Sequence, residues 1–570
     1  MFLTSRARIA DYVGRGWWEG ITVDAMFQAA VRAGGDGLAL VDPPNREKLD
    51  GQPPERLNWS TLRDRVEHAA AGLLEAGLRK DDVVCAQLPN TVDAVILFLA
   101  CARIGLILTP VVMQYREHEL GYILDQTEPR AFVTVLQFAG YDHAAMADRL
   151  ARSRPAMQIL VLNAADDPCD FSARCALADP SWVARYAVEH PTDGGEVLTI
   201  CWTSGTESRP KGVPRDHNHW VLNAKVVAEA TGMEAGDTLL NPFPLVNIGS
   251  IGGLVMTWLH IRGRLVLHHP FDLAIFLQQI EFEHVTYTIA PPAVLTALLQ
   301  QPTLIGTTDI GSLRAIGSGS APLSPWLIEG WLSQHSIQIC NVFGSNEGAA
   351  LFANAIDVPD PAERARYFPR IGATGTAWSG LAARVSRTRL VDLTTGAEIV
   401  EPGQPGEMRI TGACTFSTYW RSPEITATAF DDQGYFRTGD LFEIAGDGPL
   451  RQFYRFVGRS KEIIVRGGVN ISPAELDDLI IGQPQVKEAA TVGIPDPVLG
   501  ERVAVAVVPQ SGAAPTLADI GDWMAAKDVA IFKRPERLVI VDQLPRNAMN
   551  KVVRDQLREQ VLAALKDWPA

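Results

Sequence analysis

A polar loop at residues 203–212, Thr-Ser-Gly-Thr-Glu-Ser-Arg-Pro-Lys-Gly, carries residue types that bind phosphate. Its hydroxyls and backbone N–H groups can donate hydrogen bonds to phosphate oxygens, and the ammonium of Lys211 supplies positive charge. The stretch before it, residues 196–202, is mostly apolar and β-prone, which predicts a strand that ends in the loop. The spacing is not that of the common nucleotide P-loop, because no Ser or Thr follows the lysine. Taken alone, the loop is also typical of a surface turn.

Three more polar clusters follow predicted strands, at the edge where open α/β sheets bind ligands. The small residues at 317–322 would let a flat ring lie against the backbone, and they are also typical of a tight turn. Glu347 comes just after an apolar strand, where a carboxylate could hold Mg²⁺. Asp440 follows a small turn, where a carboxylate can accept both hydroxyls of a ribose. Solvated loop residues give the same local pattern, so no single cluster decides the function.

Two further clusters lie toward the C-terminus. Residues 458–468 combine four charges with a β-prone run and a double glycine, a pattern that is also typical of a charged hairpin. Lys551 lies in a predicted loop, far in sequence from every other cluster. Most such lysines are only solvated.

The composition indicates a folded, acidic protein of 570 residues, with 47% hydrophobic residues, 21% charged residues and a net charge of -15. The length predicts two to four domains, and the acidic balance argues against a general nucleic-acid binder. The seven cysteines form no CxxC pair and no zinc-binding spacing, so we expect the protein to be located in a reducing cytoplasm. Residues 1–20 show no targeting segment. The most apolar stretch, 91–112, is interrupted by Arg103, which predicts a buried helix and strand rather than a membrane span.

Hydrophobic periodicity predicts two successive βα arrays and therefore largely parallel sheets. The predicted units are a first array over 60–162, a loop-rich connection over 163–192, a second array over 220–318, short strands including 382–390, and a compact α+β domain after 460.

The order and spacing of these clusters resemble the adenylate-forming superfamily, which contains acyl- and aryl-CoA synthetases, luciferases and the adenylation domains of peptide synthetases. The resemblance extends from about Thr22 to Lys551. It implies an α/β fold with a large N-terminal domain, 1–459, made of two doubly wound αβ subdomains and a small β-barrel. A small mobile α+β domain, 460–570, would follow.

The resemblance also implies a role for each matching residue. The residues that match the loop for the β- and γ-phosphates are Thr203, Ser204, Gly205, Thr206 and Lys211. Those that match other nucleotide-binding positions are Gly319, Ser320, Ala321, Pro322, Phe343, Gly344, Asn346, Asp440 for the ribose and Arg459 near the domain junction. Those that match the remaining functions are Glu347 as the magnesium ligand, Lys461 as the hinge, Lys551 as the catalytic lysine, Arg466, Gly467 and Gly468 in the thiol tunnel, and Asn247, Ile248 and Ser250 near the acid. Lys551, Glu347 and Lys211 form the implied catalytic set.

Four departures from the family pattern affect these expectations. Glu207-Ser208 replaces the usual Thr-Gly of the phosphate loop, which puts a carboxylate near phosphates. Asn346 replaces a hydroxyl residue before the magnesium glutamate and can still donate a hydrogen bond. Asn247 stands where an aromatic residue or His is frequent, and Asn550 replaces the usual Gly before the terminal lysine.

The implied function is an ATP-dependent carboxylic acid–CoA ligase that uses ATP, Mg²⁺ and coenzyme A. It would form an acyl-AMP and then a thioester, and it acts on a medium-chain, alicyclic or aromatic acid. We expect no nucleic-acid partner and no transmembrane segment, and the choice between monomer and homodimer stays open. An aryl-acid adenylating enzyme that loads a carrier protein is the main alternative, because residues 214–219 and 16–20 resemble that branch. A nucleotide-binding regulator without catalysis is a third reading, encouraged by Glu207 and Asn346.

Overall fold

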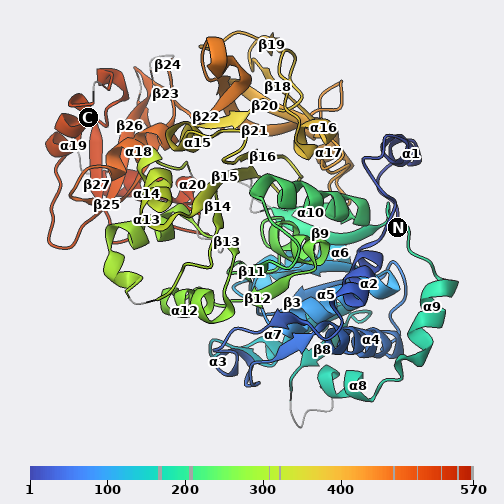
Figure 1. Cartoon of the computed structure of the whole chain (residues 1–570). Coiled ribbons are helices and arrows are strands. Elements are labelled where there is room, and N and C mark those ends of the chain that lie inside the picture. The colour runs from blue at the N-terminus through green and yellow to red at the C-terminus, as the bar shows by residue number, and fades with distance from the viewer. Residues whose placement is uncertain are drawn as a thin grey trace.

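The protein is described by a computed structural model (Figure 1). The described residues are 1–164, 170–203, 210–306, 308–319, 322–466, 469–496, 498–527, 529–547 and 551–565. Four main sheets organise this part of the chain, two of them largely parallel and two largely antiparallel. The predicted fold class is therefore confirmed.

The first parallel sheet has six strands in the order β10-β9-β4-β3-β5-β8. Its strands are β3 (Val83–Gln87), β4 (Ile107–Pro110), β5 (Ala131–Val135), β8 (Gln158–Leu162), β9 (Val197–Thr203) and β10 (Lys211–Asp216). All pairs are parallel except β9 with β10, which form the antiparallel edge. The apolar stretch 91–112 forms the buried helix α5 (Val92–Ile104) and the buried strand β4, as predicted.

The second sheet has eight strands in the order β16-β15-β14-β13-β11-β12-β1-β2. Its strands are β1 (Leu38–Val41), β2 (Arg56–Asn58), β11 (Thr238–Asn241), β12 (Arg264–Leu267), β13 (Tyr287–Ile289), β14 (Ala315–Gly319), β15 (Gln338–Gly344) and β16 (Ala350–Ala353). Its two outer pairs, β1 with β2 and β15 with β16, are antiparallel. Residues from the start of the chain thus complete a sheet that is otherwise built from residues after 237.

Helices between the two sheets give them one shared core. Buried residues from both sheets join those of α2 (Val23–Gly34), α4 (Trp59–Glu75), α5, α10 (His217–Thr231) and α11 (Thr257–Ile261). The opposite face of the six-stranded sheet is covered by α6 (Glu117–Thr127) and α7 (His143–Ala151). The opposite face of the eight-stranded sheet is covered by α12 (Leu273–Glu283), α13 (Pro292–Gln300) and α14 (Pro325–His335). This layering fixes the relative position of the two sheets, whose strand ends carry the predicted site.

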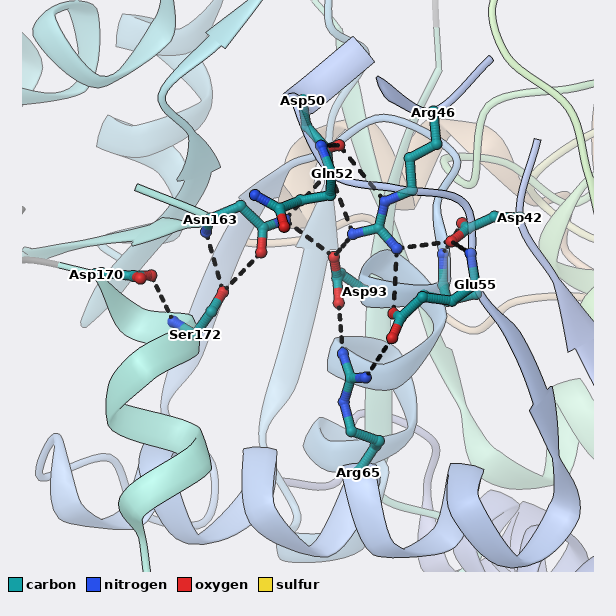
Figure 2. A network of polar contacts seen from close by, with 11 residues as sticks. Asp42, Arg46, Asp50, Gln52, Glu55, Arg65, Asp93, Asn163, Asp170 and Ser172 are labelled. Carbon is teal, nitrogen blue, oxygen red and sulfur yellow. Dashed lines mark hydrogen bonds and ion pairs between the residues drawn. The ribbon is translucent and has the colours of Figure 1, made fainter. Parts of the chain in front are cut away.

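A buried ionic network also ties the two sheets together (Figure 2). Arg46, which follows β1, is 2% exposed and donates to Asp42 at 2.6 Å and to Asp93 at the start of α5. Asn163, which follows β8, donates to both Asp50 and Asp93 at 3.1 Å. Burial raises the pKa of Asp42 to about 6, although Arg46 opposes the shift. Since each charge has a partner, the network acts as a specific link rather than as a net source of stability.

The third sheet is antiparallel and corresponds to the predicted β-rich unit. Its order is β17-β22-β21-β20-β18-β19, with β17 (Tyr367–Pro369), β18 (Ser386–Val391), β19 (Glu398–Ile399), β20 (Gly406–Gly412), β21 (Phe436–Ile444) and β22 (Phe453–Arg459). Its core is rich in aromatic rings, which pack edge to face around Phe442.

The fourth sheet belongs to the C-terminal α+β unit, drawn in red in Figure 1. Its strands are β23 (Ile464–Arg466), β24 (Val469–Ile471), β25 (Val486–Asp496), β26 (Gly500–Pro509) and β27 (Arg537–Ile540). Helices α18 (Pro473–Ile481) and α19 (Leu517–Ala525) share a core with one set of its strand residues, and α20 (Arg554–Ala564) shares a core with the other.

Two sequence expectations are wrong. The segment 163–192 is not only loop, because it contains α8 (Phe171–Leu177) and α9 (Val183–Glu189), each too short to give a clear helical period. The stretch 382–390 is not one strand, because α16 (Leu381–Val385) precedes β18.

The remaining described elements are α1 (Arg6–Gly14), α3 (Glu47–Asp50), β6 (Gln137–Phe138), β7 (Tyr141–Asp142), α15 (Pro361–Arg366), α17 (Pro423–Ala429) and the 3₁₀ and π turns. Among the helices described, none has the length and apolar character needed to cross a membrane.

Candidate active site

The predicted phosphate loop is bounded by two paired strands. Thr203 ends β9 and Lys211 begins β10, and the two residues lie directly opposite each other in the antiparallel register. The hydroxyl of Thr203 donates to the carbonyl of Lys211 at 3.5 Å. Ser204, Gly205 and Thr206, which are predicted to bind phosphate, lie outside the described residues, as do the departures at Glu207 and Ser208. The strand pair nevertheless brings Thr203 and the Lys211 backbone to one sheet edge.

Glu347 is held at the end of β15 by a residue that the sequence did not single out, Tyr419. The carboxylate is mostly buried, in a residue that is 8% exposed, and Tyr419 Oη donates to Glu347 Oε1 at 2.9 Å. The ammonium of Lys211 lies 5.4 Å from the centre of the Tyr419 ring, a cation–π geometry. Tyr419 therefore lies between the lysine of the phosphate loop and the predicted magnesium ligand.

A single glutamate suits Mg²⁺, which usually binds proteins through one or two carboxylates and completes its shell with water and substrate phosphates. The described residues contain no group of three or more His, Cys, Asp or Glu side chains that could hold a metal on their own. The residues present therefore fit a magnesium ion that is bound together with nucleotide phosphates.

Asn346 joins three of the predicted clusters. Its side-chain Nδ2 donates to the carbonyl of Trp202 at the end of β9, at 3.1 Å. Its Oδ1 accepts from the backbone N–H of Ile248, at 2.9 Å. The amide thus fixes the phosphate strand and the acid-side loop next to Glu347, with one hydrogen bond donated and one accepted.

The nucleotide-facing strands β14 and β15 approach each other closely at Gly319. A Cβ atom there would lie 1.9 Å from the carbonyl oxygen of Val342, so only glycine fits. Phe343, one residue farther along β15, packs edge to face on Phe442 with ring centroids 5.2 Å apart. Gly344 is exposed at the strand end. Ser320 and Ala321 lie outside the described residues, and Pro322 follows them.

Asp440 and Arg459 face each other across the pair β21 and β22. Arg459 Nε lies 3.4 Å from Asp440 Oδ1, and Asp440 is 8% exposed. Burial raises the pKa of Asp440 to about 6, while the positive charges of Arg459 and Lys551 oppose this shift. Lys551, more than 100 residues away in sequence, therefore lies within electrostatic reach of the predicted ribose ligand.

The loop that carries Lys551 is closed by reciprocal hydrogen bonds. The Lys551 N–H donates to Asn547 Oδ1 at 3.0 Å, and the Asn547 N–H donates to the Lys551 carbonyl at 2.9 Å. Lys551 is exposed to solvent at one side, yet neighbouring protein atoms reduce its hydration. Lost hydration and repulsion by Arg459 lower the pKa of Lys551, and Asp440 and Glu462 oppose the shift. Asn550 lies outside the described residues.

An ion pair connects the turn that holds the predicted hinge residue with the helix that follows Lys551. Lys461 is in the turn between β22 and β23, and its neighbour Glu462 pairs with Arg554 at 2.9 Å, three residues after Lys551. Arg466 makes a two-point ion pair with Glu536, at 3.0 and 3.1 Å. Gly467 and Gly468 lie outside the described residues.

The predicted acid-side residues lie in the loop that immediately precedes a π-helix at Ile251–Met256. Asn247 Oδ1 accepts from the Ser250 N–H at 3.0 Å. The Ser250 hydroxyl is fully buried and bonds with Asn241, so it stabilises the loop from within. A small apolar cavity lies next to the loop and is lined by Leu88, Val95, Phe98, Leu108, Leu245 and Ile251 among others.

Within the described segments, Tyr419 links Glu347 with Lys211. Asp440 interacts electrostatically with Arg459, Lys551 and Glu347, so the predicted ribose, lysine and metal positions lie near one another. Sequence reasoning missed Tyr419, which bonds to Glu347 from 72 positions away, and the contact of Arg215 with the Asn346 carbonyl from 131 positions away. Tyr419 follows an irregular segment, and although Arg215 lies in the stretch 214–219, no spacing connects it with Asn346.

We expect ATP affinity to depend on the charge of Asp440. The ionised carboxylate accepts ribose hydroxyls, so affinity is highest above pH 6 and falls as the pH drops through the Asp440 pKa of about 6. Between pH 7 and pH 5 the dissociation constant should rise by up to about tenfold. Calorimetric titration of the wild type and of Asp440→Asn measures this, since both proteins bind the same titrating ATP. Parallel pH profiles for the two proteins would refute the assignment.

The fold and this convergence of residues define the class of the protein as adenylate-forming. The model of the AMP-binding enzyme family matches residues 27–420, and that of the AMP-binding enzyme C-terminal domain matches residues 475–551. The chain belongs to this family, the adenylate-forming superfamily, and is an enzyme of the AMP-forming acid–thiol ligase type.

Three relatives illustrate the range of the family. The 2-hydroxy-7-methoxy-5-methyl-1-naphthoate–CoA ligase of Streptomyces carzinostaticus is 30% identical over 96% of this chain and 95% of its own. The salicyl-AMP ligase / salicyl-S-ArCP synthetase of Mycobacterium tuberculosis is 28% identical over 97% and 93%. The crystal structure of ATP-bound MatB from Rhodopseudomonas palustris superposes with a TM-score of 0.79, at 27% identity over 96% and 99%. The chain is therefore either an acid–CoA ligase or an aryl-acid adenylating enzyme.

Proposed function

We propose that this protein is an ATP-dependent carboxylic acid–CoA ligase with the residue roles predicted above. The observation that carries the proposal is the electrostatic coupling of Lys551 to Asp440 and Arg459. The position of a tail lysine within electrostatic reach of a buried carboxylate supports a role for that lysine at the nucleotide site. The ATP-bound relative supports ATP as the co-substrate.

In the first half-reaction, a carboxylate oxygen attacks the α-phosphorus of ATP and pyrophosphate leaves with the bridging oxygen. Lys211 and Thr203 would bind the β- and γ-phosphates, and Asp440 would orient the ribose. Lys551 would draw the carboxylate and the α-phosphate together, since its ammonium offsets the repulsion between the two anions. Mg²⁺ on Glu347, when bound, would neutralise the charge of the leaving pyrophosphate.

In the second half-reaction, the sulfur of coenzyme A attacks the acyl carbon of the acyl-AMP, AMP leaves, and the thiol proton goes to solvent. We propose that the C-terminal unit, residues 460–570, rotates about Lys461 between the two steps and that Arg466, Gly467 and Gly468 then line the thiol path. A hinge of this kind removes Lys551 once adenylation is complete.

We propose a medium-chain, alicyclic or aromatic acid as the substrate. The loop of Asn247 and Ile248 adjoins apolar side chains on α5, β3 and β4, which favour an apolar acid tail. The names of two relatives, a naphthoate–CoA ligase and a salicyl-AMP ligase, support the aromatic option. A medium-chain fatty-acid–CoA ligase of Escherichia coli is 27% identical over 98% of this chain, and its name supports the medium-chain option.

A carrier-loading enzyme is the second candidate because of one specific contact. The two stretches that resemble the aryl-acid branch, 16–20 and 214–219, meet in the fold, where Trp18 packs edge to face on His219 at 5.2 Å. We keep coenzyme A as the first choice because the 30% identical relative is named a CoA ligase.

A carboxylic-acid screen tests the proposal. The purified protein is incubated with ATP, Mg²⁺ and coenzyme A, and AMP release is followed for each acid. We expect AMP only with an accepted acid, together with a thioester in equal amount. Transfer to a phosphopantetheine carrier protein but not to coenzyme A would support the second candidate. No ATP–pyrophosphate exchange with any acid would refute both and favour the non-catalytic regulator.

A further inference from the structure

The first 18 residues, here the N-terminal strap, contact the segment 412–419, here the brace. Arg8 Nη2 donates to two brace carbonyls, Gly412 at 3.2 Å and Thr415 at 3.3 Å. Trp18 Nε1 donates to the carbonyl of Ala413 at 3.1 Å. The carbonyls of residues 412, 413 and 415 are thus fixed by side chains of the strap.

Side chains of β10 and α10 hold the carbonyl of Cys414 and make a second contact with that of Thr415. Arg215 Nη1 donates to Cys414 O at 3.0 Å and to Asn346 O at 3.3 Å. His219 Nε2 bonds with Thr415 O at 3.1 Å, and a carbonyl can only accept, so Nε2 carries the hydrogen. Four successive carbonyls, those of residue 412 at the end of β20 and of residues 413–415 after it, therefore have side-chain donors.

The far end of the brace determines how Glu347 is oriented. The Phe416 N–H donates to the Glu347 carbonyl at 2.8 Å, which fixes the backbone. Tyr419 Oη donates to Glu347 Oε1 at 2.9 Å, which fixes the carboxylate. Any movement of the brace would therefore move the predicted metal ligand.

The strap itself is well anchored. Trp18 is 2% exposed, and Thr4 Oγ1 donates to Asp216 Oδ2 at 2.9 Å and lies 2.9 Å from Ser417 Oγ. The match to the family model begins at residue 27, so the strap lies outside the part of the chain that the model covers.

We infer that the N-terminal strap is a positioning element of the metal–triphosphate site, in which Arg8 and Trp18 act through the brace on Glu347. The inference rests on the proposed role of Glu347. Neither strap side chain touches the nucleotide in this account, so they are positioning residues. Their effect falls on binding of the metal–nucleotide complex and not on the thioester step.

Mn²⁺ binding in the presence of a non-hydrolysable ATP analogue, followed by electron paramagnetic resonance, tests the inference without turnover. Arg8→Ala removes three hydrogen bonds to the brace, two to carbonyls and one of 3.5 Å to Ser417 Oγ, and Trp18→Phe removes one while it keeps an aromatic ring. We expect each variant to weaken Mn²⁺ binding by about fivefold to tenfold, as for the loss of a few hydrogen bonds. Hydrogen exchange of a peptide that covers the brace should quicken in both.

Matched controls lie on the same strap. Arg15 pairs with Asp11 at 2.9 Å and Trp17 stacks near it, and neither has a contact with the brace among those that the structure describes. Arg15→Ala and Trp17→Phe should bind Mn²⁺ as the wild type does. Unchanged Mn²⁺ affinity in both Arg8→Ala and Trp18→Phe would overturn this inference but leave the proposed role of Glu347 intact. A wild type that binds no Mn²⁺ with the analogue would overturn the proposed role of Glu347 and the inference with it.

Discussion

Lys551→Ala should lose the adenylation half-reaction by about 10²–10³-fold and keep the thioester half-reaction. The ammonium lies within electrostatic reach of Asp440, at the edge where ATP and the acid would meet. It has no charge to neutralise once pyrophosphate has left. ATP–pyrophosphate exchange measures the first step, and conversion of a supplied acyl-adenylate with coenzyme A measures the second.

A surface lysine of the same unit provides the control for this variant. Lys533 pairs with Glu475 at 2.8 Å, away from the site, so Lys533→Ala should leave both half-reactions intact. If Lys551→Ala slows both half-reactions equally, or slows neither, the assigned role is wrong. Equal loss would instead indicate a general defect in the C-terminal unit.

Lys461→Pro should impair the thioester step about tenfold or more, the rate equivalent of about 1–3 kcal/mol of backbone strain in the rotated state. Proline fixes φ and restricts the residue before it, so the turn between β22 and β23 would be held in one conformation. That conformation already has Lys551 near Asp440, so adenylation should change little. The same two half-reaction assays separate the effects.

Lys461→Ala is the matched control, because it removes the side chain and leaves the backbone free to rotate. It should retain most of the thioester step. A proline variant that loses adenylation by the same factor as thioester formation would remove Lys461 from the hinge role. Pyrophosphate exchange at the wild-type rate, with slow thioester formation, is the expected pattern.

Much of the α/β architecture was predictable, because long buried segments show a clear apolar run or a clear periodicity of apolar residues. The strands at 83–87, 131–135 and 158–162 and the helix at 92–104 follow directly from apolar runs and their spacing. The sheet to which a short strand belongs was not predictable. The strand β1 at Leu38–Val41 has four residues, and it joins β12 more than 220 positions later.

The strand β10 shows why an edge strand escapes detection. It contains Lys211, Pro214 and two further charged residues, so it lacks an apolar alternation. A proline is tolerated there because β10 is the outer strand of its sheet. The sequence therefore predicted the loop that precedes β10 but not the strand that fixes its far end.

The candidate site was predictable where a cluster directly follows a strand, as for Glu347 and Asp440. It was not predictable where a residue acts through tertiary contact alone. Tyr419 bonds to Glu347 from an irregular segment, and no spacing in the sequence connects the two. Asn346, a departure from the family pattern, acquires a physical reason only in the structure, where its amide bridges Trp202 and Ile248.

We propose above all that the tail lysine and the phosphate-binding strand pair act on one nucleotide. A crystal structure with bound ATP and Mg²⁺ would decide this. We expect the ribose on Asp440, the β- and γ-phosphates beside Thr203 and Lys211, and the Lys551 ammonium in hydrogen-bond contact with the α-phosphate. ATP bound with Lys551 out of contact and its phosphates away from Lys211 would refute the proposal.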